Sequence, residues 1–247
     1  MIKIITLVIK FIVTTLIALL FSSCNHSFRF DNGIKGSGNT TSETRMVNED
    51  FKSIVVSDGI SVTVEQSDSK SITVEAEDNL LEHISTKIEN GVLIIESDTN
   101  FTSIETLMVF VKMPEINGLT ASSGAQIESA NVLITEKIDV ESSSGSQIDI
   151  DVEADAISLE TDSGSTIEAR GKALQLKTVS SSGSLIDAEK LMTNEVESEA
   201  SSGSSTDVYP IVKLNAKASS GSTIGYHKNP TQTIIKTTFF GGSVIEK

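Results

Sequence analysis

A glycine-centred motif recurs about every twenty residues through the second half of the chain, and it restricts the possible folds more than any other feature. Successive repeat glycines are 21, 19, 19, 20, 18 and 21 residues apart, and serine follows each of them except the first. They are Gly124, Gly145, Gly164, Gly183, Gly203, Gly221 and Gly242. A fixed period of this length indicates a stacked repeat protein, because each unit buries its apolar side against its neighbours.

Apolar residues keep the same offsets from the glycine in most repeats. The column seven residues before it is aliphatic from Ile138 to Ile235, and the column three residues after it runs from Ile127 to Ile245. Both columns alternate with polar ones, which is the pattern of strands with one buried face. We therefore predict an all-β fold, a parallel β-solenoid in which each coil has one strand before the glycine and one after it.

Other repeat architectures fit less well. A propeller blade needs about twice this period, and a leucine-rich repeat needs a fixed asparagine that the chain lacks. Aromatic residues make up only 4% of the chain and tryptophan is absent, which agrees with a thin interior filled by Ile, Val and Leu.

The N-terminus has the pattern of an export signal. A short basic start precedes an apolar stretch from Phe11 to Phe21, which is too short to span a bilayer. Small residues then precede Cys24, the only cysteine, as in a bacterial lipobox. We predict a lipoprotein signal peptide over residues 1–23 and lipidation of Cys24. An ordinary signal peptide cut near Ser23 is the alternative.

The mature chain divides by composition into three parts. Residues 24–44 are rich in Gly, Ser, Thr and Asn, and we expect a flexible tether there. Residues 45–115 alternate in polarity without a period and predict an N-terminal β-rich cap, with a hairpin turn at Asn90–Gly91. Residues 116–247 form the predicted solenoid.

The chain has a formal charge of −15, and part of the negative charge follows the repeat. Such a surface repels phosphate backbones, so we expect no nucleic-acid partner. An acidic column four residues after each glycine either forms a solvated outer stripe or binds Ca²⁺ or a polyhydroxylated ligand. We favour the stripe, because Ca²⁺ requires six or more converging oxygens. The column comprises Glu128, Asp149, Glu168, Asp187, Asp207, Gly225 and Glu246.

The motifs with chemical potential favour structural roles. Serine recurs in nearly every coil, which indicates a stacking requirement rather than one activated hydroxyl. The three histidines, His26, His83 and His227, follow neither a nucleophile-elbow pattern nor metal-ligand spacing. A carbohydrate-cleaving β-helix would need clustered acids that interrupt the repeat. We therefore predict no catalytic residue, no metal site and no cofactor.

The two tyrosines closely follow repeat glycines, near two members of the acidic column. We predict an interaction patch of Asp187, Asp207, Tyr209 and Tyr226, with a glycan or a protein surface as its partner. A core position for Tyr226 is the alternative.

Several motifs before the repeats resemble a known family. They are Gly36-Ser37-Gly38-Asn39, Glu43-Thr44-Arg45, Phe51-Lys52-Ser53-Ile54-Val55-Val56-Ser57 and Val62-Thr63-Val64-Glu65-Gln66. Together with the Ser-Gly-Ser repeats, they resemble the family described as "putative autotransporter adhesin, head GIN domain". The resemblance covers nearly all of the mature chain. It implies a right-handed single-stranded β-helix in a secreted or lipid-anchored protein of Gram-negative bacteria.

We expect an exported outer-membrane lipoprotein that is held to the membrane by its N-terminal lipid, is not an enzyme, and serves adhesion or surface interaction. One alternative is a structural envelope spacer without a specific ligand. The other is a carbohydrate-active β-helix enzyme.

Overall fold

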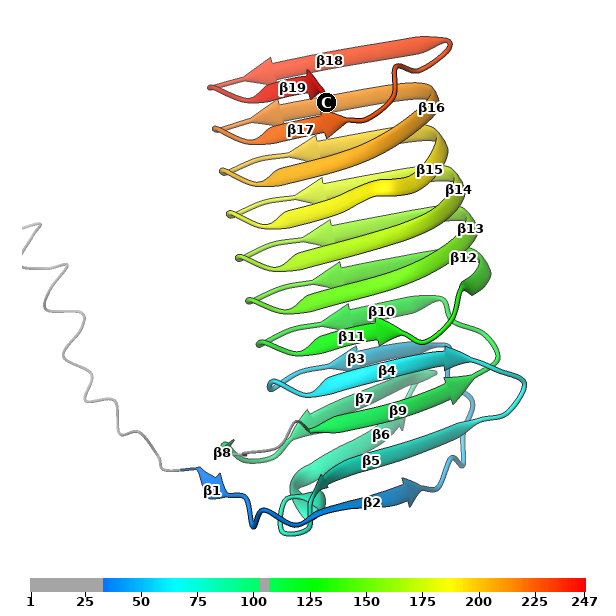
Figure 1. The fold of residues 1–247 in the computed structure, drawn as a ribbon, viewed down its shortest axis with the longest axis vertical. Coiled ribbons are helices and arrows are strands. Elements are labelled where there is room, and N and C mark those ends of the chain that lie inside the picture. Colours follow the sequence, from blue (N-terminus) through cyan, green and yellow to red (C-terminus); the bar gives the residue numbers. More distant parts are fainter. Residues whose placement is uncertain (1–32, 103–106) are drawn as a thin grey trace, which may run out of the picture. The chain divides into compact units, whose positions relative to one another are not determined.

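The computed structural model describes residues 33–102 and 107–247, and Ile34–Lys247 form one compact unit. The regular secondary structure of its described residues is β-strand, apart from the short 3-10 helix η1 (Leu81–His83) (Figure 1). Most strands stack in parallel on equivalent strands of the next coil, so the predicted parallel β-solenoid is confirmed. The predicted signal peptide, Cys24 and the first residues of the tether lie outside the described residues.

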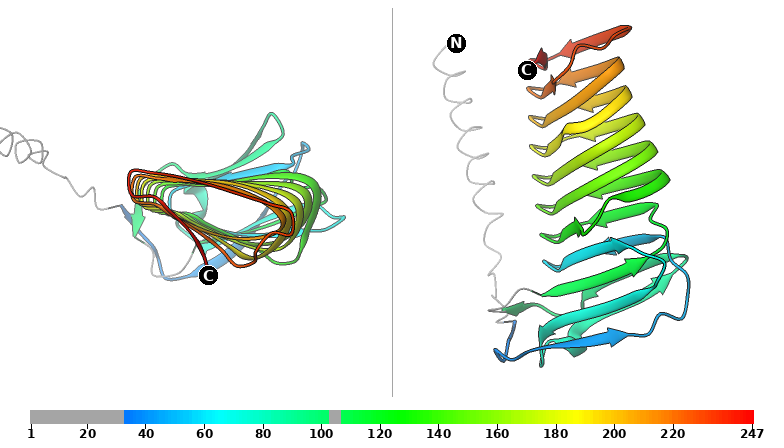
Figure 2. Two further views of the ribbon diagram at one scale, coloured as in Figure 1. Left: turned by 90° about the horizontal axis from the view of Figure 1, so that it is seen from above. Right: turned by 45° about the vertical axis from the view of Figure 1, so that its right-hand side comes forward.

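Each solenoid coil is a flattened loop with a tight bend at one edge and a broad corner at the other. We call the strands that lead into the tight bend the pre-bend sheet, and those that lead away from it the post-bend sheet. Viewed from above, the coils nearly superimpose (Figure 2). The strands are β10 (Gly118–Ala121), β11 (Gln126–Ser129), β12 (Leu133–Ser142), β13 (Gln147–Thr161), β14 (Thr166–Ser180), β15 (Leu185–Ala200), β16 (Ser205–Ser219), β17 (Thr223–Tyr226), β18 (Thr233–Phe239) and β19 (Ser243–Glu246). Strands β13 to β16 are long because each crosses the broad corner without a break.

The tight bend explains the Ser-Gly-Ser motif. In the bend before β13, Ser144 and Gly145 have φ angles of 54° and 73°, a left-handed conformation that glycine adopts easily. The amide of Gly145 donates to the carbonyl of Ser163 in the next coil at 3.2 Å. The following residue, Ser146, is buried, and its hydroxyl donates to the carbonyl of Ala121 in the preceding coil at 2.8 Å. The predicted stacking role of this serine is therefore confirmed.

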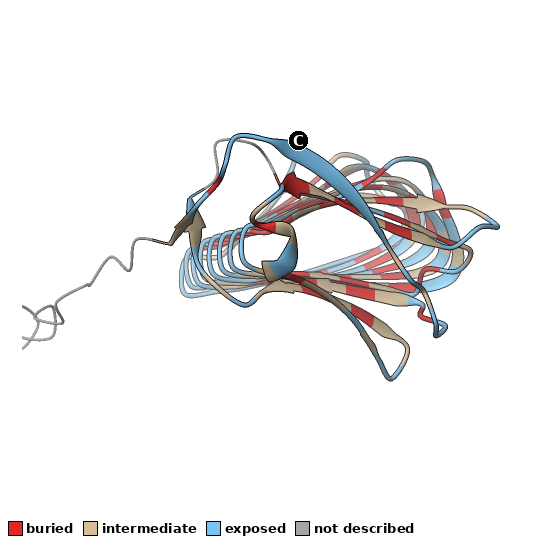
Figure 3. Cartoon of the chain, turned by 90° about the horizontal axis from the view of Figure 1, so that it is seen from below, coloured by how far each residue is buried: buried red, intermediate tan, exposed pale blue. Residues whose placement is uncertain are grey.

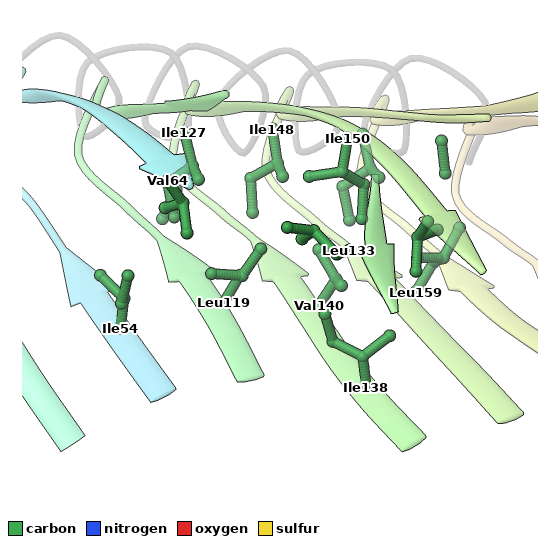
Figure 4. Close-up of a cluster of buried hydrophobic side chains, with 14 of the residues drawn as sticks. Ile54, Val64, Leu119, Ile127, Leu133, Ile138, Val140, Ile148, Ile150 and Leu159 are labelled. Atoms are coloured by element: carbon green, nitrogen blue, oxygen red, sulfur yellow. The ribbon is translucent and has the colours of Figure 1, made fainter. Parts of the chain in front are cut away.

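The core is a set of aliphatic ladders along the solenoid. Ile54, Leu119, Val140 and Leu159 come from neighbouring pre-bend strands, and their side chains point into the interior (Figure 4). The post-bend sheet contributes a matching ladder that includes Ile127 and Ile148 (Figure 4). All are nearly inaccessible to solvent, so the inward columns predicted from the repeat are confirmed.

The predicted cap contains both sheet strands and the tight bend of a further coil. Strand β3 (Ser53–Val56) pairs in parallel with β10, and β4 (Ser61–Gln66) pairs in parallel with β11. Asp58 and Gly59 form the bend between them, with positive φ angles of 61° and 72°. The solenoid therefore continues into the expected cap. The repeat pattern did not reveal this coil, because its bend lacks the Ser-Gly-Ser motif.

The N-terminal end is closed by strands that depart from the parallel pattern. Strands β7 (Val92–Ser97) and β9 (Met108–Met113) extend the two sheets in parallel, whereas β5 (Ser71–Glu77) pairs antiparallel with β9, and β6 (Ile84–Glu89) with β7. The β6–β7 hairpin turns at Asn90–Gly91, both with positive φ, as predicted. This end of the unit, with its mixture of buried and exposed residues, is seen from below in Figure 3.

The expected tether differs from the structure in its second half. Strand β1 (Ile34–Lys35) pairs with β8 (Phe101–Thr102), and β2 (Thr40–Arg45) pairs antiparallel with β5 along its whole length. The polar composition that suggested a tether belongs instead to an exposed edge strand. Between them, the amide of Gly38 donates to the buried Glu77 at 2.8 Å, which fixes this segment on the solenoid end.

The last repeat is shifted by one residue from its predicted register. Phe240 and Gly241 have the positive φ angles of the bend, so Gly241, not Gly242, is equivalent to the repeat glycines. Val244 then pairs with the inward Ile224, and Ile245 takes the outward position that we expected for Glu246. A slip of one residue exchanges the two faces of a strand. The predicted register was wrong because Gly242 and Ser243 also match the Gly-Ser part of the motif.

Candidate functional site

The acidic column forms an outer stripe of the post-bend sheet. Glu128 pairs with Asp149, which pairs with Glu168, and the register continues to Asp187 and Asp207. These side chains alternate with buried residues, so they point outwards as predicted. The stripe ends at Gly225 and Ile245.

One arginine neutralises the middle of the acidic column. Arg170 Nε donates to Asp151 Oδ1 at 2.9 Å, Nη1 donates to Glu168 Oε1 at 2.8 Å, and Nη2 lies 2.6 Å from Asp149 Oδ1. These carboxylates, with the Asp151 hydrogen bond as the largest cause, raise the pKa of Arg170 above its ordinary value. The repeat spacing places Asp151 beside Arg170, so a comparison of outward positions between coils could have found this cluster.

A second cluster surrounds Asp207 near the C-terminal end. Lys247 Nζ lies 2.6 Å from Asp207 Oδ1, and His227 Nε2 lies 3.6 Å from the same oxygen. Glu189 Oε2 is also 3.6 Å from His227 Nε2. The Asp207 side chain is only 15% exposed, so its carboxylate interacts mainly with Lys247 and His227.

The structure brings together three of the four residues of the predicted patch. Asp187 and Asp207 are neighbours across β15 and β16, and Tyr209 follows on the outer side of β16, with Lys228 Nζ 5.9 Å from its ring centre. Tyr226 is 3% exposed and belongs to the core, so its place in an accessible patch was wrong. It lies at the fifth position after the bend, which points inwards in every coil.

The outer face of the pre-bend sheet carries a shallow polar groove that the sequence analysis missed. Its volume is about 690 Å³, and lysine, carboxylate and amide side chains surround the small residues Ala156 and Ser158. Outward residues align in rows across the coils. One row contains Lys137, Ala156, Gln175, Glu195 and Lys213, and the next contains Asp139, Ser158, Lys177, Glu197 and Asn215. These columns share no residue type, so the repeat alone gave no signal.

An apolar groove of about 680 Å³ follows the broad corner. Ile134, Leu174 and Met192 line it and are 65%, 51% and 41% exposed, which is unusual for large apolar side chains. Ala154 and Ala173 form part of its floor, and charged residues such as Glu153 and Lys172 stand at its sides. The sequence analysis missed this groove because the corner lies between the repeat columns.

The residues considered for catalysis have structural partners. Ser165 and Ser204 are buried, and their hydroxyls donate to the carbonyls of Ser142 and Ser180 in preceding coils. His83 Nδ1 lies 2.9 Å from Asp98 Oδ1 at the N-terminal end. Within residues 33–102 and 107–247, no three His, Cys, Asp or Glu side chains are grouped closely enough to hold a metal ion.

The predicted lipid attachment site, Cys24, lies outside the described residues. Within the part of the chain that the structure describes, no helix has the length and apolar character needed to cross a membrane.

Known proteins with this fold support the resemblance. A "putative adhesin" from Bacteroides fragilis superposes with a TM-score of 0.78 at 18% identity, covering 87% of this chain and 99% of its own. A "putative lipid binding protein" and a "putative adhesin", both from Parabacteroides distasonis, each superpose with a TM-score of 0.72 over the same shares, at 17% and 19% identity. At these identities the likeness shows the fold alone. A comparison with curated proteins finds no match.

A family model matches the sequence directly. It is described as "Putative auto-transporter adhesin, head GIN domain" and matches residues 50–230, which include the coil formed by β3 and β4 and most of the later coils. This span is more than half of the chain, and it contains the acidic column from Glu128 to Gly225, the corner groove and most of the pre-bend groove. The chain therefore belongs to the auto-transporter adhesin, head GIN domain family.

Proposed function

We propose that the protein is a non-enzymatic, lipid-anchored component of the bacterial outer membrane that contacts other surfaces through its solenoid. The observation that carries this proposal is the groove on the pre-bend sheet. Its outward polar side chains follow one another at the spacing of stacked strands, about 4.8 Å. An extended polar polymer, such as a glycan, can make a weak polar contact at each of several coils, and such contacts add by multivalency.

The post-bend face is the less suitable of the two polar faces. Arg170 holds three carboxylates at once, and Lys247 holds the mostly buried Asp207. The pairs Lys137–Asp139 and Lys213–Glu195 of the pre-bend groove, by contrast, are single and about half exposed. The family description and the solved relatives described as adhesins support a surface-contact role over an enzymatic one. Asp187 and Tyr209 stay a predicted secondary contact.

A triple variant tests the groove. Gln175→Ala and Lys177→Ala on β14, with Asn215→Ala on β16, remove outward side chains on both sides of β15 and leave the inward ladder intact. Deletion of the gene should reduce attachment to host matrix or to other bacteria. The wild-type gene should restore attachment, and the triple variant should not.

The control carries Asp187→Ala and Tyr209→Ala on the post-bend face. If this control fails to restore attachment and the triple variant restores it, the contact lies on the post-bend face. If deletion leaves attachment unchanged and weakens the envelope instead, the spacer function replaces adhesion. Glycan cleavage by the purified protein would contradict the non-enzymatic proposal.

The corner groove favours a second candidate function, the binding of an apolar chain. Its exposed Ile134, Leu174 and Met192 form an apolar strip with charged sides, and one solved relative is described as a lipid-binding protein. A fluorescent fatty acid should bind the purified protein in this case, and Leu174→Asp should weaken the binding at least about tenfold. Unchanged binding by Leu174→Asp would exclude the corner groove as the site.

A further inference from the structure

The two ends of the solenoid are finished in different ways. At the N-terminal end, the outermost strand β2 has the sequence TTSETR, and its charged and hydroxyl side chains make a poor surface for further strand pairing. At the C-terminal end, β18 and β19 carry large apolar side chains instead. Those exposed there are Ile234, Ile235, Phe239, Phe240 and Ile245.

The last strands also have unpaired edges. Among the described strand pairings, β18 pairs with β16 and β19 pairs with β17, each on one side (Figure 1). Their outer edges therefore offer backbone N–H and C=O groups to a further strand. An apolar edge with free backbone groups favours pairing with another chain, and natural proteins usually protect such edges.

The inward side of the last coil carries two opposite charges. Lys236 takes the inward position of Ala216 in the coil below, and Glu246 takes that of Tyr226. Lys236 Nζ donates to the hydroxyl of Tyr226 at 2.6 Å and lies 4.4 Å from its ring centre. Glu246 accepts from Asn229 Nδ2 at 3.1 Å and lies 3.5 Å from the Tyr226 hydroxyl. Both residues thus belong to the inward rows on which the next coil of the stack would be placed.

We propose that the C-terminal end of the solenoid docks on the same end of a second copy of this chain. A twofold axis that runs along the strands, midway between the two sheets, places β18 of one copy on β19 of the other. Strand β18 leads into the bend and β19 leads away from it, so the two new pairs are antiparallel. This arrangement continues both sheets across the interface and pairs their free strand edges, while the outward Ile235 and Ile245 stay on the sheet surfaces.

Under that twofold axis, each inward charge at the C-terminal end of one copy faces the opposite charge at the same end of the other copy. Lys236 lies five residues before Gly241, and Glu246 lies five residues after it. The axis preserves the distance from the bend, so Lys236 of each copy faces Glu246 of the other. By the same count, Thr238 faces Val244 inside the stack, and Thr237 faces Ile245 on the outside. This reciprocity is what a twofold interface requires, and it identifies a second copy as the occupant.

Charge reversal tests the interface with the unlipidated mature chain, residues 25–247, which retains the whole compact unit. In sedimentation experiments the wild-type protein should form a dimer at micromolar concentration. Glu246→Lys places two lysines of each copy opposite two of the other, and Lys236→Glu does the same with glutamates. Each variant should raise the dissociation constant at least about tenfold.

A mixture of the two variants supplies the decisive measurement. Glu246→Lys protein carries only lysines at the two positions and Lys236→Glu protein only glutamates, so the mixture should form a heterodimer of near wild-type affinity. Glu43→Lys on the N-terminal edge strand β2 is the matched control and should leave the dimer unchanged. Because Glu246 is exposed, its variant should keep the wild-type melting temperature when both proteins are measured below the dissociation constant of the dimer.

Three results would overturn the proposal. A wild-type chain that stays monomeric at 100 micromolar would show that the end is not self-associating. Dimers that both charge variants leave intact would place the interface elsewhere. Variants that dissociate, but fail to form a heterodimer when mixed, would contradict the pairing of Lys236 with Glu246.

Discussion

At the scale of single residues, distance from the bend decides the role of a side chain. Ile167 and Ile186 are the third residues after their glycines, pair in register, and are completely buried. Glu128, at the fourth position of its coil, is exposed on the outer stripe. The repeat predicted these faces correctly because strand alternation leaves little freedom once one position of the coil is fixed.

The face assignment can be tested by placing charge on each side of the sheet. Ile167→Asp puts an unpaired carboxylate in the core, and we expect a loss of about 3–5 kcal/mol in the free energy of unfolding. Glu128→Lys puts a cation beside Asp149 on the outer stripe, and its effect should stay within about 0.5 kcal/mol. Urea unfolding of both variants measures the difference. Equal effects would mean that the two faces are wrongly assigned.

Arg170 offsets the repulsion between closely spaced carboxylates of the acidic column. Its contribution to the free energy of unfolding should therefore depend on pH. The three carboxylates raise the pKa of Arg170, so the arginine stays charged at every pH at which the protein can be studied. Its stabilising effect is therefore lost only at a pH where the carboxylates lose their charge. We expect Arg170→Met to lower stability by about 1–2 kcal/mol at pH 7, because three half-exposed carboxylates lose one shared partner.

At pH 3, where aspartate and glutamate side chains are mostly protonated, the difference between Arg170→Met and the wild type should shrink. Urea unfolding at both pH values measures it, with Lys172→Met, from a single exposed pair with Glu153, as the control. A difference that is as large at pH 3 as at pH 7 would show that Arg170 acts through packing rather than charge.

At the scale of elements, the bend and the strand contribute separately to the coil. The bend glycines have positive φ with no atom close to the position of a missing Cβ, so their requirement is conformational. Gly171 in β14 also has a positive φ, 123°, and in addition it is closely packed. A Cβ there would lie 2.1 Å from the carbonyl oxygen of Val152 in the neighbouring coil. The repeat did not mark Gly171, because its role arises from a close contact between two coils.

These two kinds of glycine should respond differently to alanine. Gly164→Ala should cost about 1 kcal/mol, the usual cost of a left-handed conformation for a residue with a Cβ. Gly171→Ala should cost clearly more, about 3 kcal/mol or above, because the backbone of β13 or β14 must move as well. Thermal unfolding ranks the two variants. A smaller loss for Gly171→Ala would contradict the close approach of these strands.

The sequence analysis correctly predicted the coils that carry the regular Ser-Gly-Ser motif. It missed the coil in which other residues form the same bend. Asp58–Gly59 forms the bend without serine, and β5 to β9 separate this coil in sequence from its neighbour in space. The edge strand β2 was taken for tether because its exposed, polar residues carry no alternation. The two grooves depend on outward residues brought together by stacking, and those positions do not repeat.

At the scale of the whole molecule, the proposed lipid on Cys24 would be joined to the solenoid by fewer residues than the predicted tether contains. The compact unit begins at Ile34, so only nine residues separate it from Cys24. Nine extended residues span at most about 30 Å. If Cys24 carries the lipid, the N-terminal end of the solenoid therefore stays near the bilayer. Charged and polar side chains, as on β2, suit the N-terminal end of the solenoid better than exposed apolar side chains would.

The anchor itself is tested by Cys24→Ala. This variant should no longer incorporate labelled palmitate and should move from the membrane fraction to the soluble fraction. Glu43→Lys, which leaves the export signal unchanged, serves as the control. Membrane association and palmitate incorporation that survive in Cys24→Ala would end the lipoprotein proposal.

The proposed lipid anchor and the proposed C-terminal docking together would place the self-complementary end away from the membrane that holds the chain. Copies on one membrane have their C-terminal ends side by side, whereas docking requires these ends to meet head-on. Two copies on opposing membranes satisfy that requirement, because each solenoid then extends the other. We therefore expect liposomes that carry the lipidated protein, with the solenoid outside, to aggregate, and Glu246→Lys liposomes to remain dispersed. Mixing Glu246→Lys liposomes with Lys236→Glu liposomes should restore aggregation, measured by light scattering. Equal aggregation of wild-type and Glu246→Lys liposomes would show that the C-terminal end does not join the two membranes.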